Sequence, residues 1–478
     1  MRRAPVICAV VAAGAFSACT SAPDTTAPAE PPPPPVVDGV GADGIGDPYY
    51  PQDGNGGYDV TAYEVSISYD PASRELTGDT VVKATATADL SRFNLDLTGF
   101  DVSAVEVDGA AAEHTREGEQ ELVVTRAAPL RAGQEFAVRV RYAGEPQNEQ
   151  DGPLGAGGWQ ISKSGGAFAA GEPHSASSWF PVNDHPRDKA TFALSARVPD
   201  GWSVISNGVE EPPVAEGGWT TYRWVEPNRI ATYLTTIGID KWTFERSKLD
   251  DGTPVVNAYA PGAEDKKAVQ ARMPQILDFL VAEYGPYPQS AAGGIYLNEN
   301  IAFSLETQGR PIYAKWAEVD VVVHELAHQW WGNSVSVDTW ADICLNECFA
   351  SYASWQWDEH QGEDLDARYR TQVARTFDRA RYWNRKLVDM GAGNEFTAVY
   401  DKGQLALHAL RRKIGEPAWD KVTREWLGTH ADGNASWSRF EDLVAATAGE
   451  DVRPFLDAWF RQASRPADEH LYPGPLAR

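Results

Sequence analysis

The sequence predicts an α+β multidomain fold, in which an N-terminal antiparallel β domain precedes a second domain rich in helices. Apolar and polar residues alternate with period two over residues 46–250, and the spacing becomes helical over residues 251–478. The chain also has 478 residues, more than one core normally contains. We therefore expect at least two domains.

The first 18 residues differ from the rest of the chain. Arg2 and Arg3 precede an apolar stretch over residues 4–16, and small residues lead from there to Cys19. This layout is that of a secretory signal, and the stretch is too short to span a bilayer comfortably. We expect residues 1–18 to be a signal peptide. "FSAC" is similar to a bacterial lipobox, in which Cys19 would be lipidated; the alternative is a plain cleaved signal with an incidental Cys19.

Residues 19–45 are rich in proline and poor in large apolar residues, so we expect a tether that does not fold on its own. A proline run extends by about 3.1 Å per residue and would hold a domain clear of a membrane. The sequence thus predicts an exported protein. It would be anchored through Cys19 on the outer side of the cytoplasmic membrane, or secreted if Cys19 carries no lipid.

The charge of the chain argues against nucleic acid as a partner. The formal net charge is −26, and no run of lysine and arginine stands out. A surface that binds phosphates needs such basic residues. A membrane is expected as a partner only through the lipid on Cys19.

Residues 46–250 read as the β domain. "TAYEVSISYD" places Tyr63, Val65, Ile67 and Tyr69 on one face and polar residues on the other, as in a half-buried strand. "EFAVRVRY" repeats this pattern, and further runs of the same kind are separated by Gly, Pro, Asp and Asn clusters. We expect these strands to form an antiparallel domain.

The pattern changes after "VVNAYAPG". "AEDKKAVQARMPQILDFLVAEYG" has apolar residues at helical spacing and ends at Gly285, which is followed by Pro286. We predict one helix there and a domain boundary near residue 250. The segment from residue 251 to residue 478 then forms about one further domain.

A group of ionisable residues begins at "HELAHQWWGN". Residues four apart on a helix share a face, so His324 and His328 can contact one ion while Glu325 reaches its flank. Most of the surrounding residues are apolar, and burying three ionisable groups is unfavourable unless something pairs them. A metal ion would do so.

Eighteen residues lie between His328 and Glu347, which falls in a second helical pattern over residues 341–360. Two helices joined by "WGNSVSVDTW" would bring Glu347 against the histidines. Two imidazoles and one carboxylate are a ligand set of catalytic zinc, which keeps water in the fourth position. The alternative is a polar helix whose core histidines are satisfied by hydrogen bonds.

The motif "HELAHQWWGN", followed by "LNECFA", resembles the M1 family of zinc aminopeptidases, whose pattern is H-E-x-x-H with a glutamate in an N-E-G-F-A context. "YDVTAYEVSISYD" and "WFPVNDHPRDKATF" resemble the family's N-terminal β domain, and "VYDKGQLALHALRR" its later catalytic segment. The resemblance covers residues 55–462, so the helical C-terminal domain of longer members is not expected. It implies a thermolysin-like α/β catalytic domain rich in helices, with the active site in the cleft between the domains.

The resemblance also implies roles for single residues. His324, His328 and Glu347 would bind one zinc ion, and Glu325 would act as general base. Tyr400 in "VYDKG" matches the family tyrosine whose hydroxyl helps to hold the oxyanion of the substrate. Judged without the family motif, a single tyrosine is more often a core residue.

An aminopeptidase must also bind a free α-ammonium, and acids beside the zinc do so. Glu306 stands where the family has the glutamate of its G-x-M-E-N segment, and Glu172 stands where it has a Gln or Glu that binds the amine. A surface acid in a turn is the alternative for Glu172. The implied partners are peptides with a free N-terminus.

Besides Cys344 and Cys348, four positions depart from the family pattern. Phe303, Leu305 and Thr307 replace its glycine, methionine and asparagine, in a segment expected to be an edge strand that pairs with the substrate backbone. We expect Phe303 to reshape the first pocket, so the side-chain preference does not carry over from the family. At Ser354 many members have an acid that supports the zinc ligands, and serine is a weaker orienting group.

Cys344 and Cys348 stand where the family has tryptophan and glycine. An export signal implies an oxidising compartment, and an i, i+4 pair on a helix is within disulfide reach. We predict a disulfide across Glu347. Two buried thiols and interference with zinc are the alternatives.

The sequence therefore predicts a zinc-dependent aminopeptidase. A zinc endopeptidase, in which Glu172 and Glu306 bind no amine, is one alternative. A catalytically inactive peptide-binding lipoprotein is another, although Glu325 and Tyr400 are both present.

Overall fold

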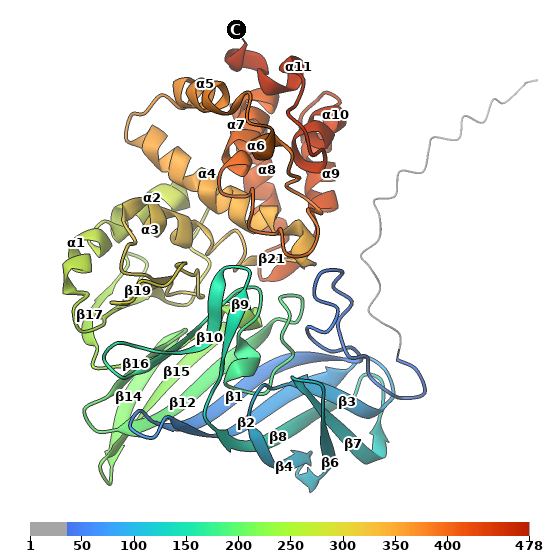
Figure 1. Cartoon of the computed structure of the whole chain (residues 1–478), viewed down its shortest axis with the longest axis vertical. Helices are drawn as coiled ribbons and strands as arrows, with labels where there is room; N and C mark the ends of the chain where they lie inside the picture. The colour runs from blue at the N-terminus through green and yellow to red at the C-terminus, as the bar shows by residue number, and fades with distance from the viewer. Residues whose placement is uncertain (1–35, 478) are drawn as a thin grey trace, which may run out of the picture.

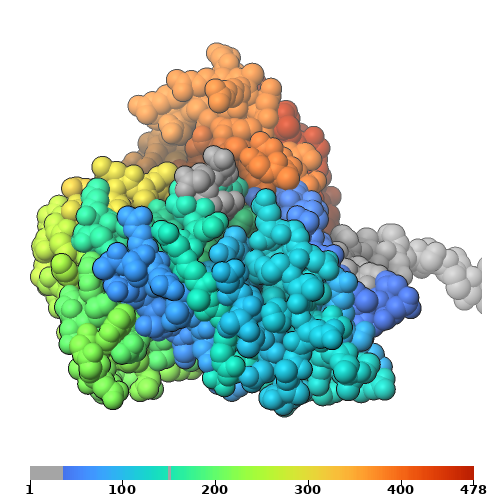
Figure 2. All heavy atoms as spheres, turned by 60° about the horizontal axis from the view of Figure 1, so that its bottom comes forward, coloured from blue at the N-terminus to red at the C-terminus, as the bar shows by residue number. Residues whose placement is uncertain are grey.

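The computed structural model describes residues 36–477, apart from the side chains of residues 149–151. The predicted signal peptide, Cys19 and most of the predicted tether lie outside the described residues. A domain of β-sheets and a domain rich in helices lie against each other (Figure 1). Figure 2 shows the β-rich domain from below, with the helices of the second domain rising behind it.

The largest sheet of the N-terminal domain has the strand order β14-β15-β12-β1-β2-β8-β4-β5. The bounds are β1 Tyr58–Asp70, β2 Glu75–Ala86, β4 Asp101–Val107, β5 Ala110–Ala111, β8 Glu135–Gly144, β12 Ala190–Pro199, β14 Val209–Glu216 and β15 Trp219–Ile230. In β1 the four residues predicted to share a face, from Tyr63 to Tyr69, are all buried.

One pair of strands corrects the prediction of an antiparallel domain. β1 and β12 run parallel, whereas the other pairs in this sheet are antiparallel. Parallel neighbours need a long connection, and here the chain passes through several other strands between β1 and β12. Period-two alternation is the same for both pairings and cannot distinguish them.

Two smaller sheets complete this domain. One has the order β13-β16-β11-β10-β9 and the other the order β3-β7-β6. The bounds are β3 Leu90–Asp96, β6 Glu113–Glu117, β7 Glu121–Leu130, β9 Asn148–Gly152, β10 Gly155–Ile161, β11 Ala167–Ala170, β13 Ser203–Ser206 and β16 Ile237–Asp240. β11 ends two residues before Glu172, which lines a pocket together with residues of the second domain.

The predicted tether extends too far along the chain. Residues 36–45 pack on the β domain, where the Gly41 N–H donates to the Arg92 carbonyl at 2.9 Å and Ile45 is buried. The proline run ends at Pro35, and apolar residues that can be buried follow it. The folded part therefore begins before residue 46.

The catalytic domain contains a four-stranded sheet in the order β17-β18-β19-β20. The bounds are β17 Thr243–Lys248, β18 Pro254–Tyr259, β19 Ala292–Tyr296 and β20 Ile312–Tyr313. β17 pairs with β18 along its whole length, so the boundary predicted near residue 250 falls in the hairpin turn between them. The structure places the division before β17.

Helices make up most of the remaining catalytic domain. They are α1 Lys267–Gln270, α2 Met273–Tyr284, α3 Val319–Ala327, α4 Cys344–His360, α5 Leu365–Thr376, α6 Ala380–Trp383, α7 Lys402–Ile414, α8 Glu416–Thr429, α9 Trp437–Thr447, α10 Arg453–Leu456 and α11 Asp468–Leu471. The single helix predicted up to Gly285 is divided into α1 and α2. Pro274 lies in the first turn of α2, where its missing N–H is tolerated.

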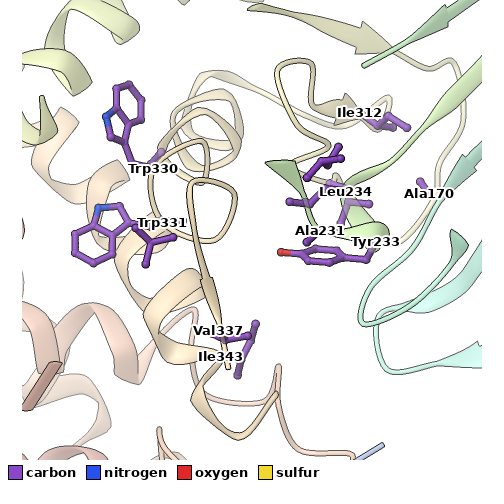
Figure 3. Close-up of a cluster of buried hydrophobic side chains, with 14 of the residues drawn as sticks. Ala170, Ala231, Tyr233, Leu234, Ile312, Trp330, Trp331, Val337 and Ile343 are labelled. Carbon is purple, nitrogen blue, oxygen red and sulfur yellow. The ribbon is translucent and has the colours of Figure 1, made fainter. Parts of the chain in front are cut away.

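The junction between the domains is both apolar and hydrogen-bonded. Figure 3 shows Tyr233 and Leu234 of the β domain and Ile312 and Trp331 of the catalytic domain among its buried side chains. Lys189 of the β domain donates from Nζ to two carbonyl oxygens of the turn after α3, at 2.8 and 3.0 Å. The two walls of the cleft are thereby fixed to each other. Within residues 36–477, none of the helices has the length and apolar composition that a membrane span requires.

Candidate metal centre and cleft

Two packed helices carry the predicted metal ligands. His324 and Glu325 lie on α3, His328 is the residue at its C-terminal end, and Glu347 lies in the first turn of α4. Apolar residues of α3 are buried, and Trp331 stacks on Phe349 of α4 with ring centroids 3.8 Å apart. This packing turns the polar side of α3 towards Glu347.

The three side chains converge on one point. The two histidine Nε2 atoms are 3.1 Å apart, and the Oε2 atom of Glu347 lies 3.2 Å from that of His324 and 3.5 Å from that of His328. Two ligands about 2.1 Å from a zinc ion at a tetrahedral angle lie roughly 3.4 Å apart. The triangle formed by these atoms thus has the size of a zinc ligand set.

The hydrogen bonds around the triangle also fit a metal. The Nδ1 atom of His328 is 2.9 Å from the Trp331 carbonyl oxygen, which can only accept, so Nδ1 carries the proton. In the neutral ring the Nε2 lone pair then faces the other two ligand atoms. The Oε2 atom of Glu347 is buried and faces the Nε2 atoms of both histidines. These donors suit a divalent cation, and zinc in particular.

The charges of these groups stabilise each other. Burial raises the pKa of Glu347, but hydrogen bonds and charge from both histidines outweigh it, and this pKa lies well below its usual range. Burial lowers the pKa of His328, but Glu306 and Glu347 more than offset it and raise this pKa to about 10. Without metal, a proton on His328 balances the carboxylate. A divalent cation would replace that proton.

Glu325 points to the same centre but is not one of the three converging atoms. Ligand atoms of Glu325 and the two histidines lie within 4.8 Å of one another. Burial, followed by the charges of Glu306 and Glu347, raises the pKa of Glu325 well above its usual range. Such a carboxyl can both accept and release a proton near the metal.

Tyr400 reaches the centre from the segment before α7. Its hydroxyl donates to Oε1 of Glu347 at 3.0 Å, and the residue remains 37% exposed along the cleft. Tyr400 is therefore not a core residue, which was the alternative for a single tyrosine. The hydroxyl can turn from Glu347 to a bound substrate.

Glu172 and Glu306 line the same cleft and come from different domains. Glu306 is 2% exposed and its Oε1 accepts from the Tyr233 hydroxyl at 3.2 Å. Glu172 is 4% exposed, and within residues 36–477 no donor reaches either of its carboxylate oxygens. Burial and then the charge of Glu306 raise the pKa of Glu172 well above its usual range. Glu172 is thus a buried residue and not the surface acid that was the alternative.

The cleft has a volume of about 410 Å³, which suits a short peptide segment. From the metal centre it follows α4 outward past Ser351 and Trp355 to Asp358. At this outer end the Arg368 guanidinium lies 2.6 Å from Asp358 and 4.6 Å from the Trp355 ring centroid. The cleft therefore has a buried acidic end and an exposed charged end.

The four departures from the family pattern have different surroundings. Phe303 is buried and lines the cleft, and Leu305 forms a bridge with Ile312 at the edge of the sheet. Thr307 donates within its own turn to the Arg310 carbonyl. Ser354 donates to the Asp320 carbonyl on α3 rather than to a ligand.

Two residues near the ligands are not among those selected from the sequence. Ser351 Oγ lies 3.4 Å from Nδ1 of His324, whereas Ser354, at the position where the family pattern has a group that supports the zinc ligands, donates to the Asp320 carbonyl. The position of Ser351 four residues after Glu347 on one helix face was the available signal. Tyr233, which contacts Glu306, had no local signal because it lies in the other domain.

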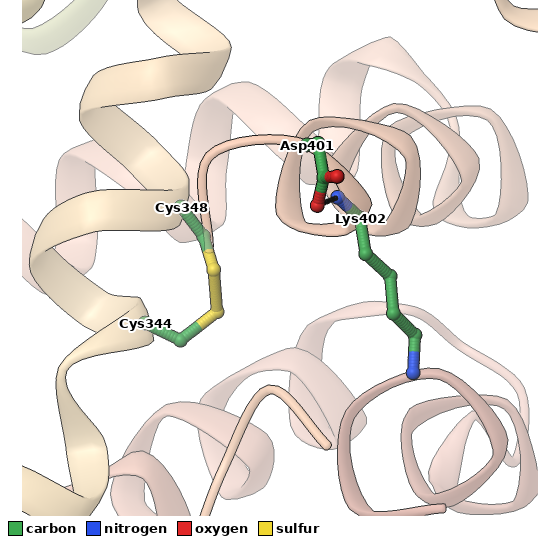
Figure 4. Close-up of a disulfide and its surroundings, with 4 residues drawn as sticks. All are labelled: Cys344, Cys348, Asp401 and Lys402. Atoms are coloured by element: carbon green, nitrogen blue, oxygen red, sulfur yellow. Dashed lines mark hydrogen bonds between the residues drawn. A yellow bond between two sulfur atoms is a disulfide. The ribbon is translucent and has the colours of Figure 1, made fainter. Parts of the chain in front are cut away.

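Cys344 and Cys348 form a disulfide at the start of α4, with their Cα atoms 4.7 Å apart (Figure 4). Both residues are fully buried. The bridge lies on the opposite side of the turn from the cleft, since neither cysteine lines it. Neither sulfur is a free ligand that could compete for the metal.

Comparison with known proteins gives two family matches along the chain. The Peptidase M1 N-terminal domain matches residues 60–234, and the Peptidase family M1 domain matches residues 292–459. The division between the two matches lies where the structure changes from the β domain to the catalytic domain.

An M1 zinc metallopeptidase from Deinococcus radiodurans, solved as a variant with a Tyr-Ser-Ala substrate, is 30% identical. The structural match covers 89% of this chain and 99% of the Deinococcus chain, with a TM-score of 0.83. The Probable aminopeptidase 1 of Saccharolobus solfataricus is 25% identical over 435 residues, which cover 85% of this chain. The mouse glutamyl aminopeptidase is 25% identical over 325 residues, 62% of this chain. The chain spans about half the length of the Saccharolobus protein, 54%, and 34% of the mouse protein.

Proposed function

Since the chain belongs to peptidase family M1, we propose that it is a zinc-dependent aminopeptidase that removes N-terminal residues from peptides. The observation that carries this proposal is the pair Glu172 and Glu306 beside the metal ligands. A buried carboxylate without a partner is unfavourable, and the α-ammonium of a peptide would pair with it. An endopeptidase has no need of such a pair.

One zinc ion, held by His324, His328 and Glu347, would supply a Lewis acid that lowers the pKa of water to about 7 and polarises a carbonyl. Glu325 would accept the proton of the attacking water on its carboxylate and deliver it to the leaving amine nitrogen. The Tyr400 hydroxyl would donate to the scissile carbonyl oxygen as that oxygen gains negative charge. Each of these groups already faces the cleft.

Glu172 and Glu306 would fix the first residue of the substrate. Charge-assisted hydrogen bonds from the ammonium to both carboxylates would hold the N-terminus at the buried end of the cleft. Because this end is closed by two acids from different domains, a peptide that continued past it would place neutral backbone against them. The site would thus select for the free N-terminus, while Phe303 limits the shape of the first side chain.

The test compares aminoacyl amides with their N-acetylated forms, before and after chelation and return of zinc. We expect cleavage of the free amines only, its loss with the chelator and its recovery with zinc. Activity indifferent to acetylation would refute the exopeptidase mechanism, and cleavage of an internally quenched, amino-blocked peptide would indicate an endopeptidase. Peptide binding without any turnover would indicate the inactive lipoprotein.

We also propose that the protein is exported and carries a lipid on Cys19. The signal-like residues 1–18 and the lipobox-like "FSAC" support this proposal. The disulfide between Cys344 and Cys348 gives independent support, because disulfides persist in oxidising compartments.

The location is tested with Cys19→Ser in the full chain. We expect the wild type to fractionate with membranes and the variant to be released in soluble, active form outside the cytoplasm. Wild-type protein that is equally soluble would leave a plain cleaved signal as the explanation, and protein retained in the cytoplasm would contradict export.

A further inference from the structure

The disulfide lies next to two groups of the active centre, Glu347 and Tyr400. Glu347 is in the first turn of α4, between the two cysteines. The residue before this helix is Ile343, whose side chain cannot cap N–H groups, and the chain enters α4 directly from the 3₁₀ turn Trp340–Asp342. Backbone hydrogen bonds from Asn346 and Glu347 to the Ile343 carbonyl oxygen, both 3.0 Å long, begin the turn that carries the metal ligand.

The disulfide adds a covalent link to this turn. It joins residues four apart, so it closes the same turn that places Glu347 against the histidines. Opening this turn would require the two sulfurs to separate, which the covalent bond prevents. Glu347 is therefore held in place by a covalent link as well as by its helix.

The bridge also contacts the start of α7. A Cβ atom on Gly403 would lie 2.7 Å from the sulfur of Cys348 and 3.0 Å from its Cβ, so only glycine fits against the disulfide. Gly403 follows Asp401 and Lys402, whose hydrogen bond at 2.6 Å begins α7 (Figure 4). Cys348 thereby limits how closely α7 approaches α4.

Tyr400 lies three residues before Gly403, and its hydroxyl donates to Glu347. The start of α7 is thus joined to the first turn of α4 twice, through this hydrogen bond and through the contact of Gly403 with Cys348. We propose that the Cys344–Cys348 disulfide is a positioning element of the active centre, which fixes Glu347 for metal binding and Tyr400 for catalysis. This inference rests on the proposed function.

The first test opens the bridge in two ways. In the folded wild type, tris(2-carboxyethyl)phosphine supplies two electrons and water supplies two protons, which gives two thiols and the phosphine oxide. The double variant Cys344→Ala, Cys348→Ala removes the sulfurs. Three readouts are needed: kcat and KM on an aminoacyl amide, the zinc dissociation constant by competition with a chromogenic chelator, and thermal unfolding.

We expect both treatments to weaken zinc binding by about tenfold or more, as is typical when groups that support ligands are lost. We also expect kcat to fall while KM stays within about twofold, because Glu172 and Glu306 bind the ammonium elsewhere in the cleft. Reoxidation should restore the wild type, and the double variant should not respond to the reductant. Unchanged zinc affinity and kcat in the folded, reduced protein would overturn the inference. So would losses that appear only together with unfolding.

A second variant tests the contact with α7. Gly403→Ala should lower kcat with little change in zinc affinity, since it displaces the start of α7 and leaves the bridge intact. Gly428→Ala is the matched control, because Gly428 is also in a helix and a Cβ there would meet nothing within 4 Å. Equal activity of the two variants would contradict the role given to Tyr400. If the oxidised wild type cleaves no aminoacyl amide, the proposed function fails, and zinc affinity alone still decides the role given to Glu347.

Discussion

The two halves of the active cleft differ in whether their buried charged groups are neutralised by neighbouring groups. On the metal side, His324, His328 and Glu347 lie within 3.5 Å of each other and neutralise one another. On the amine side, Glu172 and Glu306 are both buried acids, and the carboxylate of Glu172 has no donor within residues 36–477. The metal side can exist without a ligand because a proton can take the place of the cation. On the amine side, Glu306 accepts from Tyr233 and lies 3.9 Å from His328, whereas within residues 36–477 Glu172 has no such partner until a cationic group binds.

This difference separates the groups that act in the reaction from the groups that bind the N-terminus of the substrate. Groups on the metal side act on the scissile bond, so their loss should reduce kcat. Groups on the amine side bind the ammonium in both ground and transition states, so their loss should mainly affect KM and kcat/KM. Substitutions on the two sides should therefore give distinct kinetic patterns.

The largest effect is expected for Glu325→Gln. Loss of a general base typically reduces the rate by about 100-fold to 10,000-fold, and here the same carboxyl also returns the proton. The zinc content should stay the same, since Glu325 is not among the three converging ligand atoms. Turnover and bound zinc are measured on one sample. Glu425→Gln, an exposed glutamate of α8, is the matched control.

Tyr400→Phe should have the next largest effect. It removes one donor to the developing oxyanion, which lowers kcat by roughly 100-fold to 1,000-fold in comparable sites. Zinc affinity should fall little, because the hydroxyl donates to Glu347 without holding the metal. Steady-state kinetics give the split between kcat and KM. A rise in KM with an unchanged kcat would assign Tyr400 to substrate binding instead.

Glu172→Gln and Glu306→Gln should each lower kcat/KM for free amines by roughly 10-fold to 100-fold, because a hydrogen bond to a charged group contributes about 1.5–3 kcal/mol. The ratio of kcat/KM for free amines to kcat/KM for N-acetylated substrates should decrease as well. The measurement is kcat/KM for matched amine and acetylated amides. If acetylated substrates remain equally poor, the amine is recognised elsewhere.

Replacing a glutamate by glutamine should have opposite effects on stability on the two sides. Glu172→Gln should raise the unfolding temperature of the metal-free protein, since it removes a buried carboxyl without a partner. Glu347→Gln should lower it, because the buried histidines lose their counter-charge. Calorimetry of the chelated proteins measures both. A fall in both cases would show that Glu172 is compensated in solution.

The smallest effect is expected at the exposed outer end of the cleft. Asp320 and Asp358 lie there together with Arg368, which is already paired with Asp358. Peptides with lysine beyond the scissile bond should be cleaved about two- to fivefold faster than those with glutamate. The effect is small because exposed charges interact weakly in water. The preference should fade at high salt. Asp320→Asn should weaken it, and a preference insensitive to salt would point to a shape effect.

The predicted fold class and the metal ligands follow from local patterns. His324 and His328 share a face because a helix has 3.6 residues per turn, and β1 was predicted from its alternation. The boundaries were less accurate. The turn after β17 and the packed residues 36–45 both contain Gly and Asp, which are common in a linker and in a folded loop alike.

By itself, the sequence determined the elements whose periods are local, the residue types that suit zinc, and two cysteines within reach of a disulfide. Only the tertiary structure decided that Glu172 is buried without a donor within residues 36–477, that β1 lies parallel to β12, and that Ser351 rather than Ser354 faces His324. The physical reason is that local periods depend on backbone geometry alone. Contacts between distant segments depend on which surfaces are buried together over the whole chain.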